Sequence, residues 1–187
     1  MKWVTRNYVH LDRVASAWLI RRFVDRDCDL TFVPSAEEAA KAKTAIPFAV
    51  PGAELSARDG FGSAFRKILK QYEIRDEALE MVADIVESGI AYALSDLKGD
   101  AIDGGDLKRL EGIGLSALSE GMIYLSEGDA QNIENSAQIY EALYAFCRAK
   151  CIGAGKPEIL QKAFPERWEA MKAELALDEG GASGLRL

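Results

Sequence analysis

All of the strand-like segments of this chain lie within its first fifty residues. Apolar and β-branched runs at residues 3–6, 30–33 and 46–50 predict three short strands. Pro47 lies inside the third run and lacks an N–H to donate, so this strand is expected at an edge of the sheet. From Ser63 onward the sequence shows helical patterns only. The chain should therefore fold around a small sheet that is covered by many helices.

Helices are expected both between the strands and after them. One should run from about His10 to Asp25, with Asp12 favourable near its positive N-terminus. A second should follow Ser35, which can act as its N-cap, with Glu38 completing a capping box. The later segments are residues 63–72, 76–88, 105–118, 132–150 and 156–177, the last with a break at Pro165. The expected fold class is α+β and helix-rich, with a small three-stranded mixed sheet and about seven helices.

The length and composition indicate one domain. The 187 residues are 49% hydrophobic, enough for one core over residues 1–177, and the glycine-rich residues 178–187 should form a flexible tail. No stretch approaches the ~20 apolar residues that span a bilayer, and the N-terminus lacks the apolar segment of a secretory signal. The cysteines number three, too few and odd in number for a disulfide framework. We expect a cytoplasmic protein with no membrane partner.

The charges are unevenly distributed along an acidic chain. With 23 basic and 30 acidic residues the net charge is −7, which argues against direct nucleic-acid binding. A local group of guanidinium side chains can nevertheless bind a small anion within an acidic protein. The first 26 residues hold such a group: Arg6, Arg13, Arg21, Arg22 and Arg26.

The segment from His10 to Asp25 is the main candidate site. On a helix that begins near His10, Arg13 and Arg21 are eight residues apart and share a broad face. The small Ala17 lies between them and leaves room for a ligand. This spacing favours a small anionic ligand that both arginines contact.

A structural role for the arginines is the alternative. Arg22 points to the other side of the same helix, where Asp12 or Asp25 could pair with it. All three helical arginines could then be ordinary salt-bridge partners.

A metal site is a second interpretation of the same segment. His10, the only histidine, and Asp12 supply two donors, which is short of the three or four protein ligands typical of zinc. Glu54, in the turn Pro-Gly-Ala-Glu, could add a carboxylate. A divalent metal is thus a candidate cofactor, and these residues could instead be acid and base groups of an enzyme. Cys147 and Cys151 share one helix face without a further ligand nearby, and are expected to be structural.

Several motifs together resemble the ChrB C-terminal domain, a chromate-resistance family. The motifs are Trp3-Val-Thr-Arg6, His10-x-Asp12-Arg13, Trp18-Leu-Ile-x-Arg22-Phe, Val50-Pro-Gly-Ala-Glu-Leu55 and Tyr140-x-Ala-Leu-Tyr-Ala-x-Cys-Arg148. The resemblance runs from about Trp3 to Arg148, most of the chain. It implies a bacterial, cytoplasmic protein linked to chromate resistance, either a chromate-responsive regulator or a stand-alone accessory domain.

The chain departs from the family pattern at positions that matter for a metal site. Ala57 stands where family members commonly have a histidine, and residues 127–130 stand where an Asp-Asp-His motif is usual. If the family site binds metal through those histidines, most of it is missing here. Because the resemblance begins at Trp3, the DNA-binding part of the regulators is not expected, and DNA binding is not carried over.

Three functions follow from these observations. We expect first an oxyanion-binding or sensing module, in which Arg13 and Arg21, with Arg6 or Arg22, hold a chromate-, sulfate- or phosphate-like ligand that His10 and Asp12 help to orient. The second is a metal-dependent enzyme of unknown reaction that uses His10, Asp12 and Glu54. The third is a scaffold with a degenerate site, for which a homodimer is a candidate assembly.

Overall fold

The strands and helices alternate in the first part of the chain, and only helices follow. The structure is a computed structural model, which describes residues 1–56, 60–98 and 107–181, with side chains as far as Leu177. The first part contains β1 (Lys2–Arg6), α1 (Asp12–Leu19), the π-helical turn η1 (Ile20–Val24), β2 (Asp29–Val33), α2 (Ala36–Ala40) and β3 (Ile46–Pro47). The second part contains α3 (Ala64–Gln71), α4 (Glu77–Lys98), α5 (Glu111–Leu125), α6 (Asp129–Gly155), α7 (Pro157–Leu160) and α8 (Glu166–Gly181). The helix-rich α+β expectation is confirmed.

The described strands form a parallel sheet in the order β2-β1-β3. Trp3 of the central strand lies opposite Leu30 on one side and Ile46 on the other. The expectation of a mixed sheet is therefore wrong. Each connection between successive strands contains a helix, which returns the chain to the same end of the sheet before the next strand begins. β3 is an edge strand, as Pro47 predicted.

The long helices differ from the expected segments mainly at their ends. α4 was expected to stop at Ser88, and it continues to Lys98. Gly89, the next residue, therefore lies inside α4. There α4 comes very close to Gly112 of α5. α5 was expected to begin at Gly105, which lies outside the described residues, and its helix runs from Glu111 to Leu125. The backbone of α8 reaches Gly181, and the rest of the expected tail lies outside the described residues.

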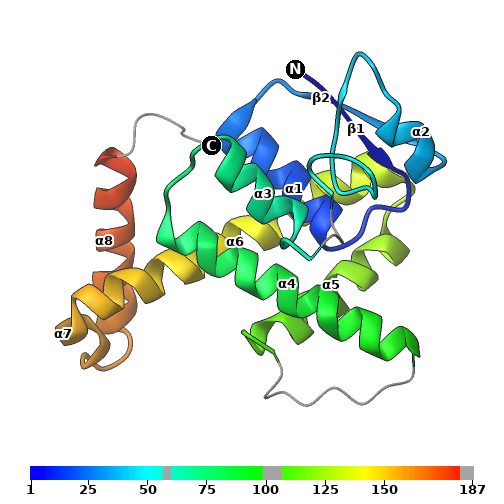
Figure 1. Cartoon of the computed structure of the whole chain (residues 1–187). Coiled ribbons are helices and arrows are strands. Elements are labelled where there is room, and N and C mark those ends of the chain that lie inside the picture. Colours follow the sequence, from blue (N-terminus) through cyan, green and yellow to red (C-terminus); the bar gives the residue numbers. More distant parts are fainter. Residues whose placement is uncertain (57–59, 99–106, 182–187) are drawn as a thin grey trace.

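The hydrophobic core lies where the sheet, α1, α3, α4 and α6 meet (Figure 1). The ring of Trp18 stacks on Phe65 of α3 and on Tyr140 of α6, with ring centroids 6.4 and 5.9 Å apart. The largest fully buried side chains include Trp3, Tyr140, Phe48, Phe65, Leu19, Ile20 and Leu79. α7 and α8 lie at the far end of α6, away from the sheet (Figure 1). None of the described helices is long and apolar enough to cross a membrane.

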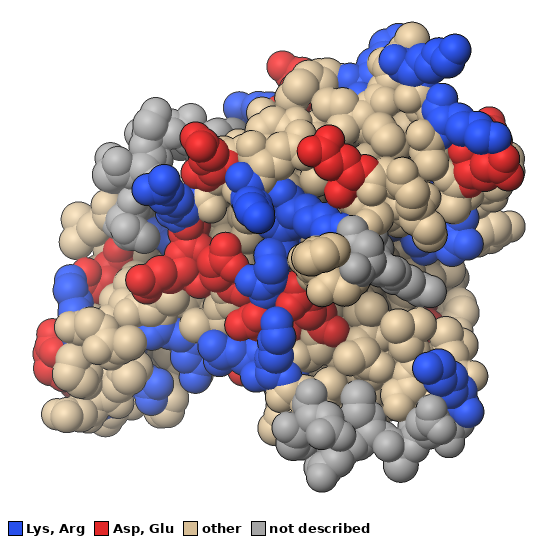
Figure 2. Space-filling model, viewed as in Figure 1, with Lys and Arg blue, Asp and Glu red and all other residues tan. Residues whose placement is uncertain are grey.

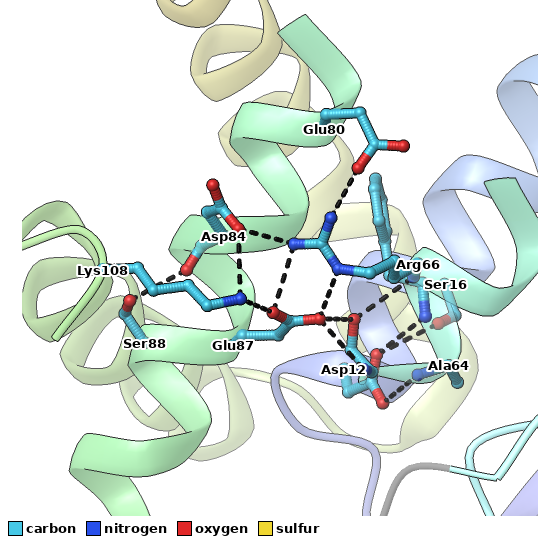
Figure 3. Close-up of polar contacts among 11 residues, drawn as sticks. Asp12, Ser16, Ala64, Arg66, Glu80, Asp84, Glu87, Ser88 and Lys108 are labelled. Atoms are coloured by element: carbon cyan, nitrogen blue, oxygen red, sulfur yellow. Dashed lines mark hydrogen bonds and ion pairs between the residues drawn. The ribbon is translucent and has the colours of Figure 1, made fainter. Parts of the chain in front are cut away.

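A charged network joins α3 to α4 and to the segment before α5. Acidic and basic side chains gather over this part of the surface (Figure 2). The guanidinium group of Arg66 lies within 2.7 Å of the Glu87 carboxylate and 2.6 Å of the Asp84 carboxylate, and it also pairs with Glu80. Lys108 adds a second cation, 2.7 Å from Glu87 (Figure 3). The network stabilises the crossing of α3 over α4.

Candidate functional site

A cavity of about 570 Å³ opens at the carboxyl ends of the described strands. Arg6 lines it from the end of β1, Ala36 from the segment after β2, and residues 49–51 from the segment after β3. The strand order β2-β1-β3 means that the chain continues first on one side of β1 and then on the other. In open parallel sheets, the carboxyl ends at such a reversal are the usual place for a ligand.

Helices α4 and α5 form the opposite wall of the cavity. Ile90, Ala93 and Leu97 of α4 make part of it apolar. Glu120 and Tyr124 of α5 contribute polar groups, and the Tyr124 hydroxyl donates a hydrogen bond to the Glu120 carboxylate. An apolar wall with a few polar groups is typical of small-molecule sites.

The loop between β1 and α1, which carries His10, is held in place by α6. The Asp129 carboxylate accepts hydrogen bonds from the backbone N–H groups of Tyr8 (3.1 Å) and Val9 (2.7 Å). The side-chain amide of Asn132 donates to the carbonyl oxygen of Val9 at 3.0 Å. Residues more than a hundred positions away therefore fix the backbone directly before His10.

The same loop is held on the other side of His10 and is strained. The N–H of Leu11 donates to Ser119 Oγ at 2.9 Å, and the Leu11 carbonyl accepts from the Tyr140 hydroxyl at 3.2 Å. Tyr8 and Leu11 have φ angles of 59° and 40°, a region that non-glycine residues rarely occupy. Such strain persists only where surrounding contacts enforce it, and it concentrates at functional sites.

His10 is half-buried and lines the cavity. Its buried Nε2 atom has no hydrogen-bond partner among the described residues. Burial and the neighbouring Arg13 guanidinium lower the pKa of His10, although Glu120 and the Ser116 backbone act in the opposite direction. The lowered pKa favours the neutral imidazole. Because the contact with the Ser116 backbone uses the other ring nitrogen, Nε2 is left as a hydrogen-bond acceptor, which suits the hydroxyl of a protonated oxyanion.

Arg13 and Arg6 bring positive charge to the same cavity. Arg13 is half-buried, and its Nη2 atom donates to the carbonyl oxygen of Tyr8 at 2.9 Å. This bond orients the guanidinium group relative to the strained loop. Arg6 is exposed at the end of β1. The structure thus places Arg13, His10 and Arg6 along the lining of one cavity.

Asp12 borders the cavity, but its carboxylate is directed to the start of α3 (Figure 3). It accepts hydrogen bonds from the backbone N–H groups of Ala64 (2.8 Å) and Phe65 (3.1 Å). Burial raises the pKa of Asp12, and these hydrogen bonds oppose that rise. Because both oxygens already accept backbone hydrogen bonds, Asp12 has the geometry of a helix cap.

Arg21 and Arg22 do not line the cavity. Arg22 pairs with Glu141 of α6, its Nε atom 3.3 Å from the carboxylate, and the expected partners Asp12 and Asp25 are wrong. Asp25 instead pairs with the amino group of the N-terminus. Arg21 interacts with the Cys28 thiol. The π-helical turn η1 explains its position, since a wider turn breaks the α-helical spacing that would have aligned Arg21 with Arg13.

The residues proposed for a metal site are not brought together. Glu54 is not among the described residues that line the cavity. Within the described parts of the chain, no three His, Cys, Asp or Glu side chains form a group that could hold a metal ion. Ala57, the position where relatives carry histidine, lies outside the described residues. Cys147 is buried, as expected, and burial raises the pKa of its thiol to about 12.

The sequence did not single out the residues that complete the site. Glu120, Tyr124 and the loop-holding Ser119 come from a segment of α5 that carries no local motif for chemistry, whereas Asp129 lies within residues 127–130, which the family resemblance had marked. Only the packing of α4, α5 and α6 against the β1–α1 loop brings them near His10.

The comparison with known families finds one match, and it covers the cavity. A family model described as "ChrB, C-terminal domain" matches residues 3–147. The match includes all the described residues that line the cavity. No curated protein and no solved structure matches the chain significantly.

Proposed function

Because the chain belongs to the ChrB C-terminal domain family, the chromate-resistance family that its motifs resemble, we propose that it binds a small oxyanion in the cavity at the carboxyl ends of the strands. The family match supports the relation to chromate resistance. The residues of the cavity support the kind of ligand.

One observation carries the proposal: Arg6, Arg13 and His10 converge on a single cavity. Guanidinium groups form charge-assisted hydrogen bonds with the oxygens of chromate, sulfate and phosphate. Arg13 is anchored by Tyr8, and the buried Nε2 of His10 has no partner among the described residues. A site built in this way needs little reorganisation when an anion binds.

The proposed anion site differs from the one that the sequence suggested. Arg13 and His10 remain, Arg6 takes the place of Arg21, and Asp12 supports the site by fixing the start of α3. Arg22 belongs to the contact between η1 and α6. The ligand groups therefore come from the end of β1, the loop that follows it and the first turn of α1, and side chains of α6 hold that loop.

Calorimetric titration with chromate, sulfate and phosphate tests the proposal. We expect binding of at least one of these anions, and Arg13→Gln should weaken it about tenfold or more, because a charge-assisted hydrogen bond is lost. Arg26→Gln is the matched control, since Arg26 is exposed and outside the cavity lining. Absence of binding for all three anions, or an equal effect of both substitutions in folded variants, would contradict the proposal.

A further inference from the structure

The cavity is larger than a bare tetrahedral oxyanion requires. Its volume of about 570 Å³ lies within the range of roughly 300–1,000 Å³ that is typical of sites for organic small molecules. An ion of five heavy atoms at Arg13 and His10 would leave most of that space to water. The cavity therefore has room for a larger body that carries the anionic group.

The cavity holds groups of both charges. Arg13 and His10 are half-buried, whereas Arg6, Glu120 and Asp96 are exposed. Glu120 acts on the pKa of His10, so a carboxylate lies near the proposed anion site. Such carboxylates repel a free dianion and attract a protonated amine.

One wall of the cavity is apolar and accessible. Leu97 and Tyr124, which line it, are 83% and 75% exposed. Ile90, Ala93 and Ile123 continue this surface into the cavity. The Tyr124 hydroxyl also holds the Glu120 carboxylate at the edge of the same surface. A hydrocarbon or aromatic body would cover it.

We propose that the ligand of this cavity is an organic zwitterion. Its oxyanion group binds at Arg13 and His10, its apolar body lies along α4 and α5, and a protonated amine faces Glu120 and Asp96. The inference rests on the proposed function, because it places the anionic group in the same oxyanion site. It adds the class of ligand: an amine that also carries a phosphonate, phosphate or sulfonate group.

Three probes of increasing complexity test this inference on the full chain by calorimetry. They are inorganic phosphate, benzylphosphonate and 4-(aminomethyl)benzylphosphonate, which add first the apolar body and then the amine. We expect affinity to rise at each step, with roughly a fivefold gain from the amine. Glu120→Gln should remove most of that last gain without weakening the binding of phosphate. Glu111→Gln is the matched control, because Glu111 is exposed on the same helix but outside the cavity lining.

The outcomes separate the two proposals. If phosphate binds as tightly as the aminomethyl probe, or if Glu120→Gln tightens all three probes equally, the zwitterion inference is wrong and the oxyanion site stands. If none of the probes binds to the folded protein, and chromate and sulfate do not bind either, both proposals are wrong. Loss of binding for every probe in Arg13→Gln, together with selective loss in Glu120→Gln, would support both.

Discussion

The carboxylates of Glu87 and Asp12, which come from α4 and α1, both accept hydrogen bonds from backbone N–H groups at the start of α3 (Figure 3). Their pKa values nevertheless shift in opposite directions. Asp12 is fully buried, where burial raises its pKa more than the neutral amides of Ala64 and Phe65 lower it. Burial also raises the pKa of Glu87, but hydrogen bonds from Arg66, Lys108 and Ser63 outweigh it and lower the pKa from 4.5 to about 2. Nearby cations therefore decide the sign of the shift.

Glu87→Gln should destabilise the protein at neutral pH and change its response to acid. A lowered pKa in the folded state means that the Glu87 carboxylate stabilises the fold above pH 4.5 and that this contribution is lost as the pH falls from 4.5 toward 2. We expect a loss of about 2–3 kcal/mol at pH 7 in urea unfolding. The difference between the two proteins should shrink at pH 3. Asp12 titrates in both proteins, so the comparison isolates Glu87.

Glu80→Gln is the control for this experiment. Glu80 pairs with the same Arg66, but its side chain is 51% exposed, so its loss should cost less than about 1 kcal/mol. Equal effects of the two substitutions, or a Glu87 effect that does not depend on pH, would contradict the assignment.

At the scale of elements, α4 and α5 cross at two glycines. A Cβ atom on Gly112 would lie 2.6 Å from the backbone nitrogen of Gly89 and 2.7 Å from the carbonyl oxygen of Ile85. Backbone atoms cannot move aside as a flexible side chain can. This close approach sets the position of α4 relative to α5, and both helices line the cavity. A change at the crossing should therefore affect both the stability of the protein and its ligand binding.

Gly112→Ala should therefore separate α4 from α5. We expect a loss of about 3 kcal/mol in the free energy of unfolding, near the upper end for overpacked sites, together with weaker anion binding. Gly114→Ala, two residues along the same helix, meets no atom within 4 Å and should instead stabilise the protein by about 0.5–1 kcal/mol through helix propensity. Urea unfolding and calorimetry check both variants. A tolerated Gly112→Ala with unchanged binding would show that the crossing does not position the wall.

At the scale of the whole molecule, the fold was more predictable than the site. The strands and the caps have local causes: Ser35 and Ser63 accept hydrogen bonds from the first turns of α2 and α3, and Asp76 does the same at the start of α4. The direction of the strands was missed, because no short segment specifies it. The cavity depends on the packing of α4, α5 and α6 around the β1–α1 loop, and the placement of Arg21 depends on a π-helical turn that spacing rules do not foresee.

The C-terminal helices should be separable from the site. The family match ends at residue 147, and α8 packs mainly on α6 and α7, far from the cavity (Figure 1). A chain that ends at Lys156 loses the hydrogen bond from Arg148 Nη2 to the Leu175 carbonyl (3.0 Å) and the packing of Leu160 on Gly153. We expect cooperative unfolding with a loss of about 1–3 kcal/mol, since a hydrogen bond and a small apolar contact are removed.

Anion binding by the shortened chain should stay within about twofold of that of the full chain, because none of the described residues that line the cavity is removed. Circular dichroism and calorimetry on the same samples check both statements. A shortened chain that still unfolds cooperatively but no longer binds the anion would mean that α7 and α8 contribute to the site from a distance. Such a result would mean that residues after the family match are needed for binding, although the described residues that line the cavity lie between residues 6 and 124.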